Sequence, residues 1–412
     1  MNLDETFLIR FFRRAWRQWR HEITPGGKLI VAGIVFSMVG TLDIHFPVYQ
    51  FFCTLVVFTL VCGTVGVVLR PRVRLSGQLP LKAVVGETTT VQMTVANRSR
   101  LPVYDLSLGF YGLTPAIEEL AAEHSIPYVP GKETVTIPVP LRPRRRGLHE
   151  VAPLRAFSTF PFNLGRFGRN RHDLESLLVL PDFHPLVHLD IPVGRRHQPG
   201  GIALTSNVGE SPEYIGNREY VAGDSPRRID FRSWARLAVP VVKEYQEEYF
   251  CRVALIVDTF VPGRNQPPPD GFPELEAAIS LAAAVASALD GGEYILDIFA
   301  AGPELYVFRT GRHTAPFENV LEILACVDAC RQNPFETVTP ALAEEIGRIS
   351  TAVCIFLDWD DHRRQLVRTI QEAGCETKTI VIRDGATTQP AIGGDLEVFS
   401  PRQVRSGGVE EL

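Results

Sequence analysis

The sequence predicts a multidomain fold: an N-terminal transmembrane helical hairpin, then a small antiparallel β-sandwich, then an α/β domain with a mainly parallel sheet. Two long apolar runs lie close together near the N-terminus, short proline-punctuated strands follow them, and after residue 250 apolar strands alternate with helices. The length of 412 residues exceeds one ordinary domain. With 45% hydrophobic and 22% charged residues the chain can build packed cores, which excludes global disorder.

The two apolar runs cover residues 29–46 and 48–69. A helix needs roughly 20 mainly apolar residues to cross about 30 Å of hydrocarbon. The second run meets this length, whereas the first is shorter and ends with Asp43 and His45, which we expect at the far interface. We therefore predict two transmembrane helices over residues 29–70. The alternative is a buried helical hairpin in a soluble core, and a cleaved signal peptide fits poorly because no cleavage site is evident.

Lysine and arginine placement predicts the orientation of these spans. Basic residues precede or open the first span, the loop between the spans has none, and three arginines directly follow the second. By the positive-inside rule both chain ends are cytoplasmic, so we expect a two-pass protein of the inner (plasma) membrane. Residues 1–28 are expected to be a basic amphipathic cytosolic N-terminus, because residues 7–20 mix aromatic and arginine side chains.

The β-rich part predicted for residues 71–200 rests on alternation and on prolines. Val91, Met93 and Val95 alternate with polar neighbours, as in a half-buried strand. Prolines between residues 127 and 153 punctuate the strands. Eight arginines fall within residues 142–171, and we expect them to pair within the protein or to meet anionic lipid rather than nucleic acid.

Strand–helix alternation characterises residues 251–400. The apolar runs 252–258 and 352–358 each end in an acid, which is typical of buried parallel strands. Ligands on such sheets bind at the carboxyl ends of the strands, where Asp258 and Asp358 would lie. The expected divisions are therefore 1–28, 29–70, 71–200, a linking segment over 201–250, 251–400, and a tail over 401–412.

The linking segment is the densest polar stretch of the chain. Arginines alternate there with carboxylates and aromatic residues, and guanidinium groups bind carboxylates in pairs and stack on aromatic faces. One interpretation is an ion-pair lattice that clamps the β part onto the α/β part. The other is a catalytic site, which is less favoured because no His, Cys or Ser in the segment has an evident base partner. The candidate residues are Arg218, Glu219, Tyr220, Gly223, Asp224, Arg228, Asp230, Ala235, Arg236 and Glu244.

These residues resemble the bacterial family called domain of unknown function 58. The family pattern is Arg-Glu-Tyr, two residues, Gly-Asp, Arg, Ile-Asp-Trp, Ala-Arg and a run ending in Glu, and Phe231 replaces the usual Trp here. Residues 86–102 and 144–167 resemble the family's membrane-attached β part. The resemblance implies a von Willebrand factor A-like (Rossmann-like) α/β domain and a role by protein contact in assembly or cell-envelope processes. It also implies association with MoxR-type AAA+ ATPases and transglutaminase-like proteins.

The resemblance raises the question of a metal site. A von Willebrand factor A domain binds Mg²⁺ through Asp-x-Ser-x-Ser after its first strand, and hard oxygen ligands suit that ion. Here the motif begins at Asp258, but Phe260 and Pro262 stand at the two serine positions and cannot ligate. Asp358 beside Asp258 would attract Mg²⁺ only weakly, so we predict no standard metal site and no cofactor.

The leading functional hypothesis is a non-enzymatic, membrane-anchored adaptor or scaffold that binds a protein partner such as a MoxR-type AAA+ ATPase. The sequence has no P-loop, HExxH or GxSxG motif, so nucleotide use and common hydrolase schemes lack support. The alternative is a metal-dependent ligand binder or enzyme with an acidic site near Asp258 and Asp358. A third reading is a structural envelope scaffold that works without an ATPase. The expected partners are a protein and the lipid bilayer, not nucleic acid, and the sequence predicts no oligomeric state.

Overall fold

The computed structural model describes residues 22–40, 48–110, 112–120, 124–192, 214–245, 251–263, 266–290, 294–301, 305–309, 317–390 and 396–412. The chain forms two compact units. The first comprises Met1–Asp182 with Asn265–Glu276 and Leu321–Val327, and the second comprises Phe183–Arg264, Ala277–Val320 and Asp328–Leu412. The expected amphipathic segment over residues 7–20 lies outside the described residues.

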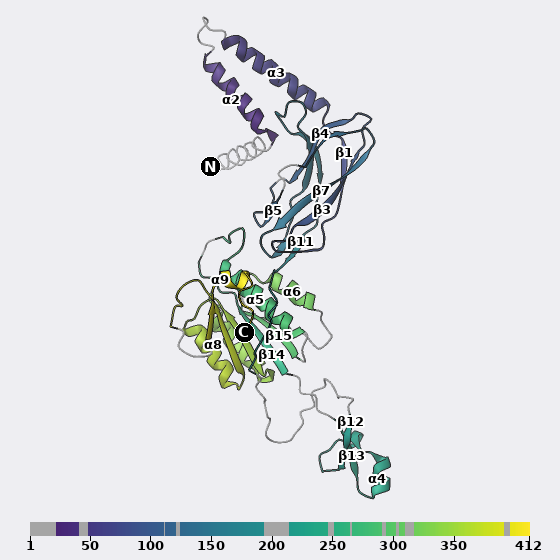
Figure 1. Ribbon diagram of the computed structural model, residues 1–412, viewed down its shortest axis with the longest axis vertical. Coiled ribbons are helices and arrows are strands. Elements are labelled where there is room, and N and C mark those ends of the chain that lie inside the picture. The colour runs from purple at the N-terminus through teal and green to yellow at the C-terminus, as the bar shows by residue number, and fades with distance from the viewer. Residues whose placement is uncertain are drawn as a thin grey trace, which may run out of the picture. The chain divides into compact units, whose positions relative to one another are not determined.

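Two apolar helices open the first unit, α2 (Pro25–Gly40) and α3 (Val48–Val68), and they contact each other. By length and composition, α3 is the one described helix able to cross a membrane. Helix α2 has 16 residues and begins at Pro25 rather than at the predicted residue 29, because proline suits the first turn of a helix. Figure 1 shows both helices, and a membrane span by α2 stays a prediction.

Three sheets build the β-rich part of the first unit. Two four-stranded sheets are wholly antiparallel, and in a third, three-stranded sheet β11 pairs parallel with β2 and antiparallel with β8. The first sheet is β1 (Val73–Ser76), β3 (Thr89–Asn97), β7 (Thr134–Pro143) and β5 (Ile117–Glu119). The second is β10 (Phe167–His172), β9 (Leu154–Ser158), β4 (Val103–Phe110) and β6 (His124–Val129). The third is β2 (Lys82–Val84), β11 (Leu177–Leu180) and β8 (Gly147–His149).

One hydrophobic core joins these sheets. Met93 of β3 and Leu141 of β7 are fully buried in the same cluster as Leu106 of β4 and Leu154 of β9. The inward side of each strand therefore faces a shared interior, as the alternation of apolar residues predicts for a sandwich.

Strand β7 contains three prolines that we expected to punctuate strands rather than lie within one. Pro138 and Pro140 pair across the ladder with β3, and the strand runs to Pro143. On its other side β7 meets only the three-residue strand β5. Most of that edge needs no ladder hydrogen bonds, and proline is tolerated at such edges because it has no N–H to donate.

Two of the arginines within residues 142–171, Arg144 and Arg146, pair with acidic and carbonyl groups of the first unit. Arg144 binds both carboxylate oxygens of Asp270, at 2.7 and 3.0 Å. Arg146 is buried, forms an ion pair with Glu276 and donates to the carbonyl oxygens of Leu324 and Val327. These carbonyls lie at the end of a helix, where a cation is favourable.

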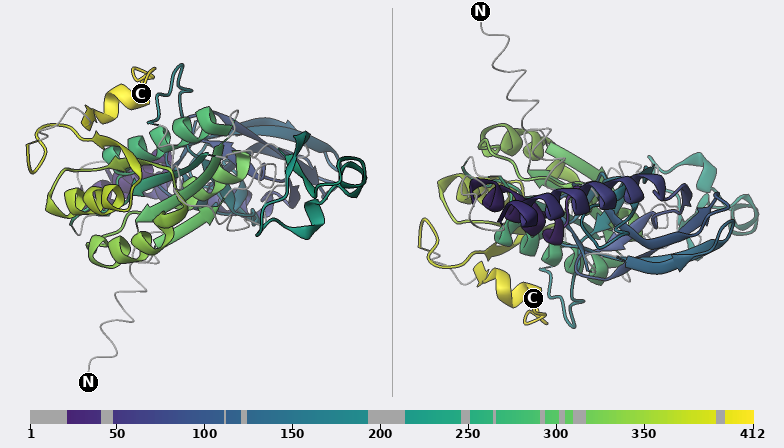
Figure 2. Two further views of the ribbon diagram at one scale, coloured as in Figure 1. Left: turned by 90° about the horizontal axis from the view of Figure 1, so that it is seen from below. Right: turned by 90° about the horizontal axis from the view of Figure 1, so that it is seen from above.

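A six-stranded sheet organises the second unit, in the order β16-β15-β14-β17-β18-β19 and parallel except for β16. Helices cover both faces of the sheet (Figure 2). The strands are β14 (Cys251–Asp258), β15 (Tyr294–Ala301), β16 (Leu305–Arg309), β17 (Thr351–Phe356), β18 (Glu376–Ile382) and β19 (Leu396–Phe399). The helices are α5 (Pro273–Asp290), α6 (Phe317–Cys326), α7 (Phe335–Glu345), α8 (Asp361–Glu372) and α9 (Pro401–Arg405).

The strand order reverses between β14 and β17. From β14 the chain builds outward through β15 and β16, then crosses to β17 and builds the other way through β18 and β19. Such a reversal leaves a crevice at the carboxyl ends of the two central strands, the usual ligand position in open α/β sheets. Asp258 ends β14 and Asp358 follows β17, so both predicted carboxylates lie at this edge.

Three predicted boundaries in this part need correction. Strand–helix alternation predicts a helix over residues 341–349. The helix instead begins at Phe335 and passes into a 3-10 turn, Ile346–Arg348, and Pro340 within it does not end it. Residues 401–412 are not a loose tail. They form α9, with a capping box at Ser400, and then pair through Glu410 and Leu412 with residues 187–190. The segment from Phe183 therefore belongs to the second unit, not to the β part.

Candidate functional site

The family-like motif folds as a hairpin, residues 214–245, which we call the motif hairpin. Strands β12 (Tyr214–Glu219) and β13 (Val241–Tyr245) pair antiparallel, with Arg218 opposite Val242. Their connection holds a 3-10 turn, Pro226–Arg228, and the short helix α4, Phe231–Leu237. The predicted motif residues therefore share one small structural element.

Asp224 and Arg218 fix the first turn of the motif hairpin. The guanidinium of Arg218 donates to both carboxylate oxygens of Asp224, at 2.7 and 2.8 Å. The amide of Val221 donates to the same carboxylate at 2.9 Å, and Gly223 supplies a positive φ of 116° that the turn requires. The Arg218 hydrogen bond and then the Val221 amide lower the pKa of Asp224 to about 2.

Asp230 fixes the second turn by capping α4. Its carboxylate accepts hydrogen bonds from the amides of Arg232 and Ser233, from the Ser233 hydroxyl at 2.6 Å and from the Asn217 side chain at 3.0 Å. Because α4 has unpaired N–H groups at its start, an aspartate there is strongly preferred. The hydrogen bonds from Ser233 and Asn217 lower the pKa of Asp230 to about 2.

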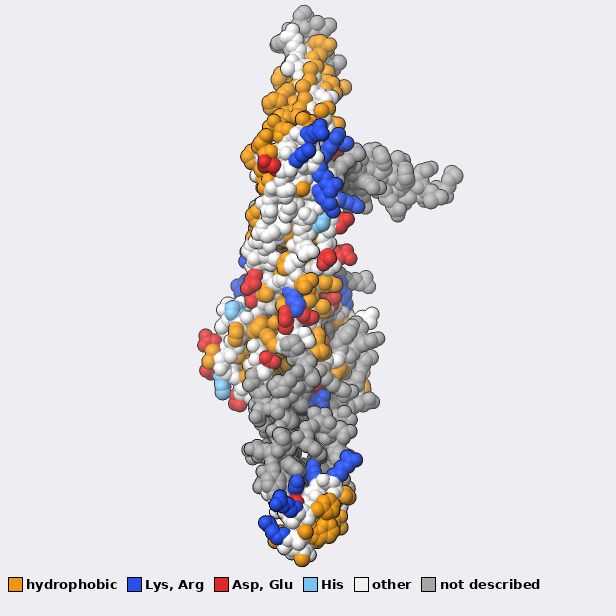
Figure 3. Space-filling view, turned by 90° about the vertical axis from the view of Figure 1, so that its right-hand side faces the viewer, with side chains coloured by type: hydrophobic (Ala, Val, Ile, Leu, Met, Phe, Trp, Pro, Cys, Tyr) orange, Lys and Arg blue, Asp and Glu red, His pale blue; other side chains and the backbone are white. Residues whose placement is uncertain are grey.

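The apolar side chains of the motif hairpin remain exposed. Phe231 is 67% exposed and stacks at 6.1 Å on Trp234, which is 38% exposed. Figure 3 shows an apolar patch on the hairpin with basic side chains beside it. The exposed apolar residues are Tyr220, Val221, Phe231, Trp234, Leu237 and Val239, and the exposed arginines beside them are Arg227, Arg228, Arg232 and Arg236.

The remaining motif residues take simpler places. Glu219 and Ala235 are exposed on the hairpin. Glu244 belongs to β13, and its side chain lies outside the described part. The Arg218–Asp224 ion pair, which sequence reasoning assigned to a clamp between domains, lies within the hairpin itself.

A buried ion pair lies at the carboxyl ends of β14 and β17. Asp258 is fully buried, and its carboxylate accepts from Arg363 Nε at 2.8 Å and from the amides of Leu357 and Phe260. Burial raises the pKa of Asp258, while the Arg363 charge and the two amides oppose that rise. Arg363 also binds Asp360 at 2.5 Å.

Aromatic rings enclose the Arg363 guanidinium. It lies 4.8 Å from the ring centre of Phe335 and 5.8 Å from that of Phe260. Such contacts favour a desolvated arginine. The cationic position beside Asp258 is therefore filled by a side chain of the protein.

Asp358 is also fully engaged. It accepts from the hydroxyl and amide of Thr388 at 2.5 and 2.9 Å and forms an ion pair with Arg383 at 2.6 Å. Burial alone would raise the pKa of Asp358, but the hydrogen bonds from Thr388 and Trp359 and the Arg383 charge hold it below its ordinary range. Among the described residues, no three His, Cys, Asp or Glu side chains come together as metal ligands would.

Sequence reasoning missed Arg363. The signal in the sequence was an arginine in the first turn of a helix. A cation there is unfavourable next to the positive end of the helix dipole, so a carboxylate is expected nearby to compensate it. Asp360, three residues earlier, is one such partner, but Asp258 is 105 residues away in the sequence.

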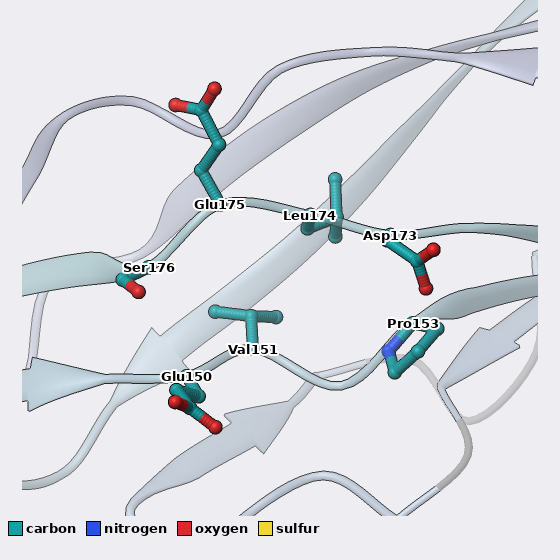
Figure 4. A pocket seen from close by; sticks show the side chains of 7 residues that line it. All are labelled: Glu150, Val151, Pro153, Asp173, Leu174, Glu175 and Ser176. Carbon is teal, nitrogen blue, oxygen red and sulfur yellow. The ribbon is translucent and has the colours of Figure 1, made fainter.

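A surface pocket of about 570 Å³ lies in the β part of the first unit. It is lined by Glu150, Val151, Pro153, Asp173, Leu174, Glu175 and Ser176. Its three carboxylates point in different directions rather than toward one another (Figure 4). They do not form a converging acidic site.

Comparison with known protein families confirms the family resemblance for part of the chain. Residues 216–382 match the family model described as "Protein of unknown function DUF58". The match begins in the motif hairpin and ends with β18. No curated protein matches the chain.

Similar solved structures include α2-macroglobulin of Escherichia coli from domain MG7 to the C-terminus, at 14% identity and TM-score 0.21. Others are a CARDB domain from Pyrococcus furiosus, at 12% and 0.19, and a protein of unknown function from Porphyromonas gingivalis W83, at 14% and 0.20. They cover 28%, 26% and 29% of this chain, and the chain spans 17%, 94% and 53% of theirs. TM-scores this low do not establish a common fold.

Proposed function

Because residues 216–382 match the DUF58 family, we propose that this protein is a membrane-anchored adaptor whose motif hairpin binds a protein partner. The observation that carries the proposal is that the polar motif residues bond within the hairpin, whereas its aromatic side chains are exposed. Its polar motif residues, Arg218, Asp224 and Asp230, bond within the hairpin. Phe231 and Trp234 stay exposed.

The composition of the exposed patch supports a protein partner. Aromatic residues and arginine dominate binding energy at protein interfaces, because they bury large areas and bind carboxylates in pairs. The hairpin offers Trp234 and Phe231 with four exposed arginines around them. Its partner surface would be apolar with an acidic rim, and a MoxR-type AAA+ ATPase is the class that the family resemblance implies.

The membrane part of the proposal rests on α3. This helix is long and apolar enough to span, and three arginines, Arg70, Arg72 and Arg74, directly follow it. We propose that α2 also crosses the membrane, so that α2 and α3 together form a two-pass anchor in the inner membrane, with both termini cytoplasmic.

The alternative function, an enzyme or metal-dependent ligand binder at the sheet edge, has less support. Asp258 is bound by Arg363 and Asp358 by Arg383, so neither carboxylate is poised as a base or metal ligand. We propose a non-enzymatic role that needs no cofactor and does not involve nucleic acid.

The test is chemical cross-linking in native membranes, followed by purification of the full chain and mass spectrometry. We expect an AAA+ ATPase among the cross-linked proteins. The double variant Phe231→Ser, Trp234→Ser should lose it, because it removes the apolar patch but leaves Asp224 and Asp230 in place. Val398→Ser is the matched control, since Val398 is a 44% exposed apolar residue on β19. Recovery of the protein alone, or equal recovery with the hairpin variant, would contradict the proposal.

A further inference from the structure

A loop of the β part, residues 159–167, docks against the chain entering α2. The amide of Thr24 donates to the carbonyl oxygen of Leu164 at 3.3 Å, and the Thr24 hydroxyl donates to that of Asn163. The amide of Arg166 donates to the carbonyl oxygen of Glu22 at 2.8 Å. The loop is thus joined to the start of α2 as a short strand pair would be.

Close packing holds the same loop to both helices. A Cβ atom at Gly27 of α2 would overlap the carbonyl oxygen of Leu164, and one at Gly66 of α3 would overlap the ring of Phe167. Eight residues before Gly66 in α3, the ring of Phe58 lies 5.2 Å from the ring of Phe162. Phe162 and Asn163 both adopt positive φ, 60° and 51°, so the loop turns sharply at this point.

The position of Phe58 sets the depth that the loop reaches. Phe58 is ten residues from either end of α3, which corresponds to about 15 Å of helix on each side. A spanning α3 would therefore hold Phe58 within the hydrocarbon layer, which is about 30 Å thick. Phe162 contacts that level and is 69% exposed, so lipid is the medium that its ring would meet.

The polar groups of this region suit such a position. Irregular backbone is tolerated at membrane depth only where protein satisfies its polar groups. Here the loop bonds to Thr24 and Glu22, and the Asn163 amide donates to Thr159 within the loop. Basic side chains border the apolar helices at their base (Figure 3). Arg70 and Arg72, which follow the end of α3, are exposed.

We propose that loop 159–167 is a membrane-inserted element: Phe162 enters the acyl-chain layer beside α3, while Arg70 and Arg72 bind lipid phosphate groups. The bilayer is the occupant because the exposed ring continues the apolar surface of α3 and the arginines follow at headgroup level. This inference rests on the proposed membrane span by α3. The loop would contact lipid in addition to α2 and α3, and its bonds to the helices hold the β part against them.

The test is photo-crosslinking of the full chain in vesicles of phosphatidylcholine and phosphatidylglycerol. The photoreactive residue p-benzoylphenylalanine replaces Phe162, or Leu60 of α3, or Leu81. Leu60 is 63% exposed on α3 and reports the span. Leu81 is a 78% exposed apolar residue before β2 and serves as the matched control.

Lipid adducts at positions 162 and 60, with none at 81, are the expected result. Adducts at 60 without adducts at 162 would overturn the inserted loop and leave the anchor standing, whereas no adducts at 60 would remove the anchor itself. Adducts at 162 should be enriched in phosphatidylglycerol, and Arg70→Gln with Arg72→Gln should abolish that enrichment. Adducts that match the bulk lipid composition would overturn the phosphate contact.

Discussion

Arg363 reaches from the first turn of α8 to the carboxylate of Asp258 at the end of β14, with Nη2 and Oδ2 2.7 Å apart and both side chains almost fully buried. The pair fills the position where open α/β sheets commonly hold a ligand. Removing one member would leave the other charged and buried without compensation. Breaking the pair should therefore destabilise the second unit.

Replacing Arg363 tests this role. Arg363→Ala should destabilise the protein by about 3–5 kcal/mol, the usual cost of breaking a buried pair. Arg364→Ala is the matched control. Arg364 is the next residue, and its ion pair with Asp361 is long, at 3.7 Å, and involves a mostly exposed carboxylate. That control should cost at most about 1 kcal/mol. Chemical denaturation of the solubilised full chain measures both, and equal effects would contradict a structural role for the buried pair.

Acid should loosen the motif hairpin at unusually low pH. The pKa of Asp230 is about 2 in the folded hairpin and lies below its ordinary 3.8, so its stabilising effect is complete above about pH 4. It is lost as the pH falls through about 2. In ¹⁹F NMR of chain labelled with fluorotryptophan, the Trp234 signal should change over this range. Asp230→Asn keeps a capping side chain and should weaken the transition, since of the two carboxylates with a lowered pKa only Asp224 remains. A wild-type transition centred near pH 4 would count against the hydrogen bonds described.

Two glycines of α3 distinguish the loop contact from general helix effects. Gly66→Val should destabilise the first unit by about 1–3 kcal/mol, because the new side chain displaces the ring of Phe167. Gly63→Val, three residues earlier, should be nearly neutral, since a Cβ there meets nothing within 4 Å. Thermal unfolding of the full chain in detergent gives the comparison. If both variants lower the midpoint equally, the contact between α3 and Phe167 is not a source of stability.

Thiol reactivity should follow burial. Burial, with a smaller effect of the neighbouring Cys375, raises the pKa of the Cys354 thiol to about 12. Because the thiolate is the reactive form, Cys354 should resist alkylation in the native protein at pH 8, whereas exposed Cys326 reacts. Peptide mass spectrometry after brief treatment with N-ethylmaleimide measures both sites. Alkylation of Cys354 as fast as Cys326 would contradict the buried position.

Periodicity allowed the sequence to predict the elements that depend on near neighbours. Alternation around Met93 predicted β3, and the uninterrupted apolar run before Asp258 predicted the buried strand β14. Boundaries were less accurate where a local rule competed with packing. Helix α7 begins at Phe335 rather than at the predicted residue 341, because Pro340 inside it does not end it. The packed C-terminus beyond Ser400 has too weak a pattern to distinguish it from a tail.

The sequence by itself determined the order of the parts, the apolar helix α3 and the identity of the family-like motif, because each depends on residues close together in the chain. Only the tertiary structure decided what those residues contact. In the folded chain Asp258 pairs with Arg363, the motif carboxylates bond within the turns of the hairpin, and the ring of Phe162 contacts that of Phe58. The physical reason is that an ion pair or a ring contact depends on distance in space, and residues a hundred positions apart become neighbours only when the chain packs.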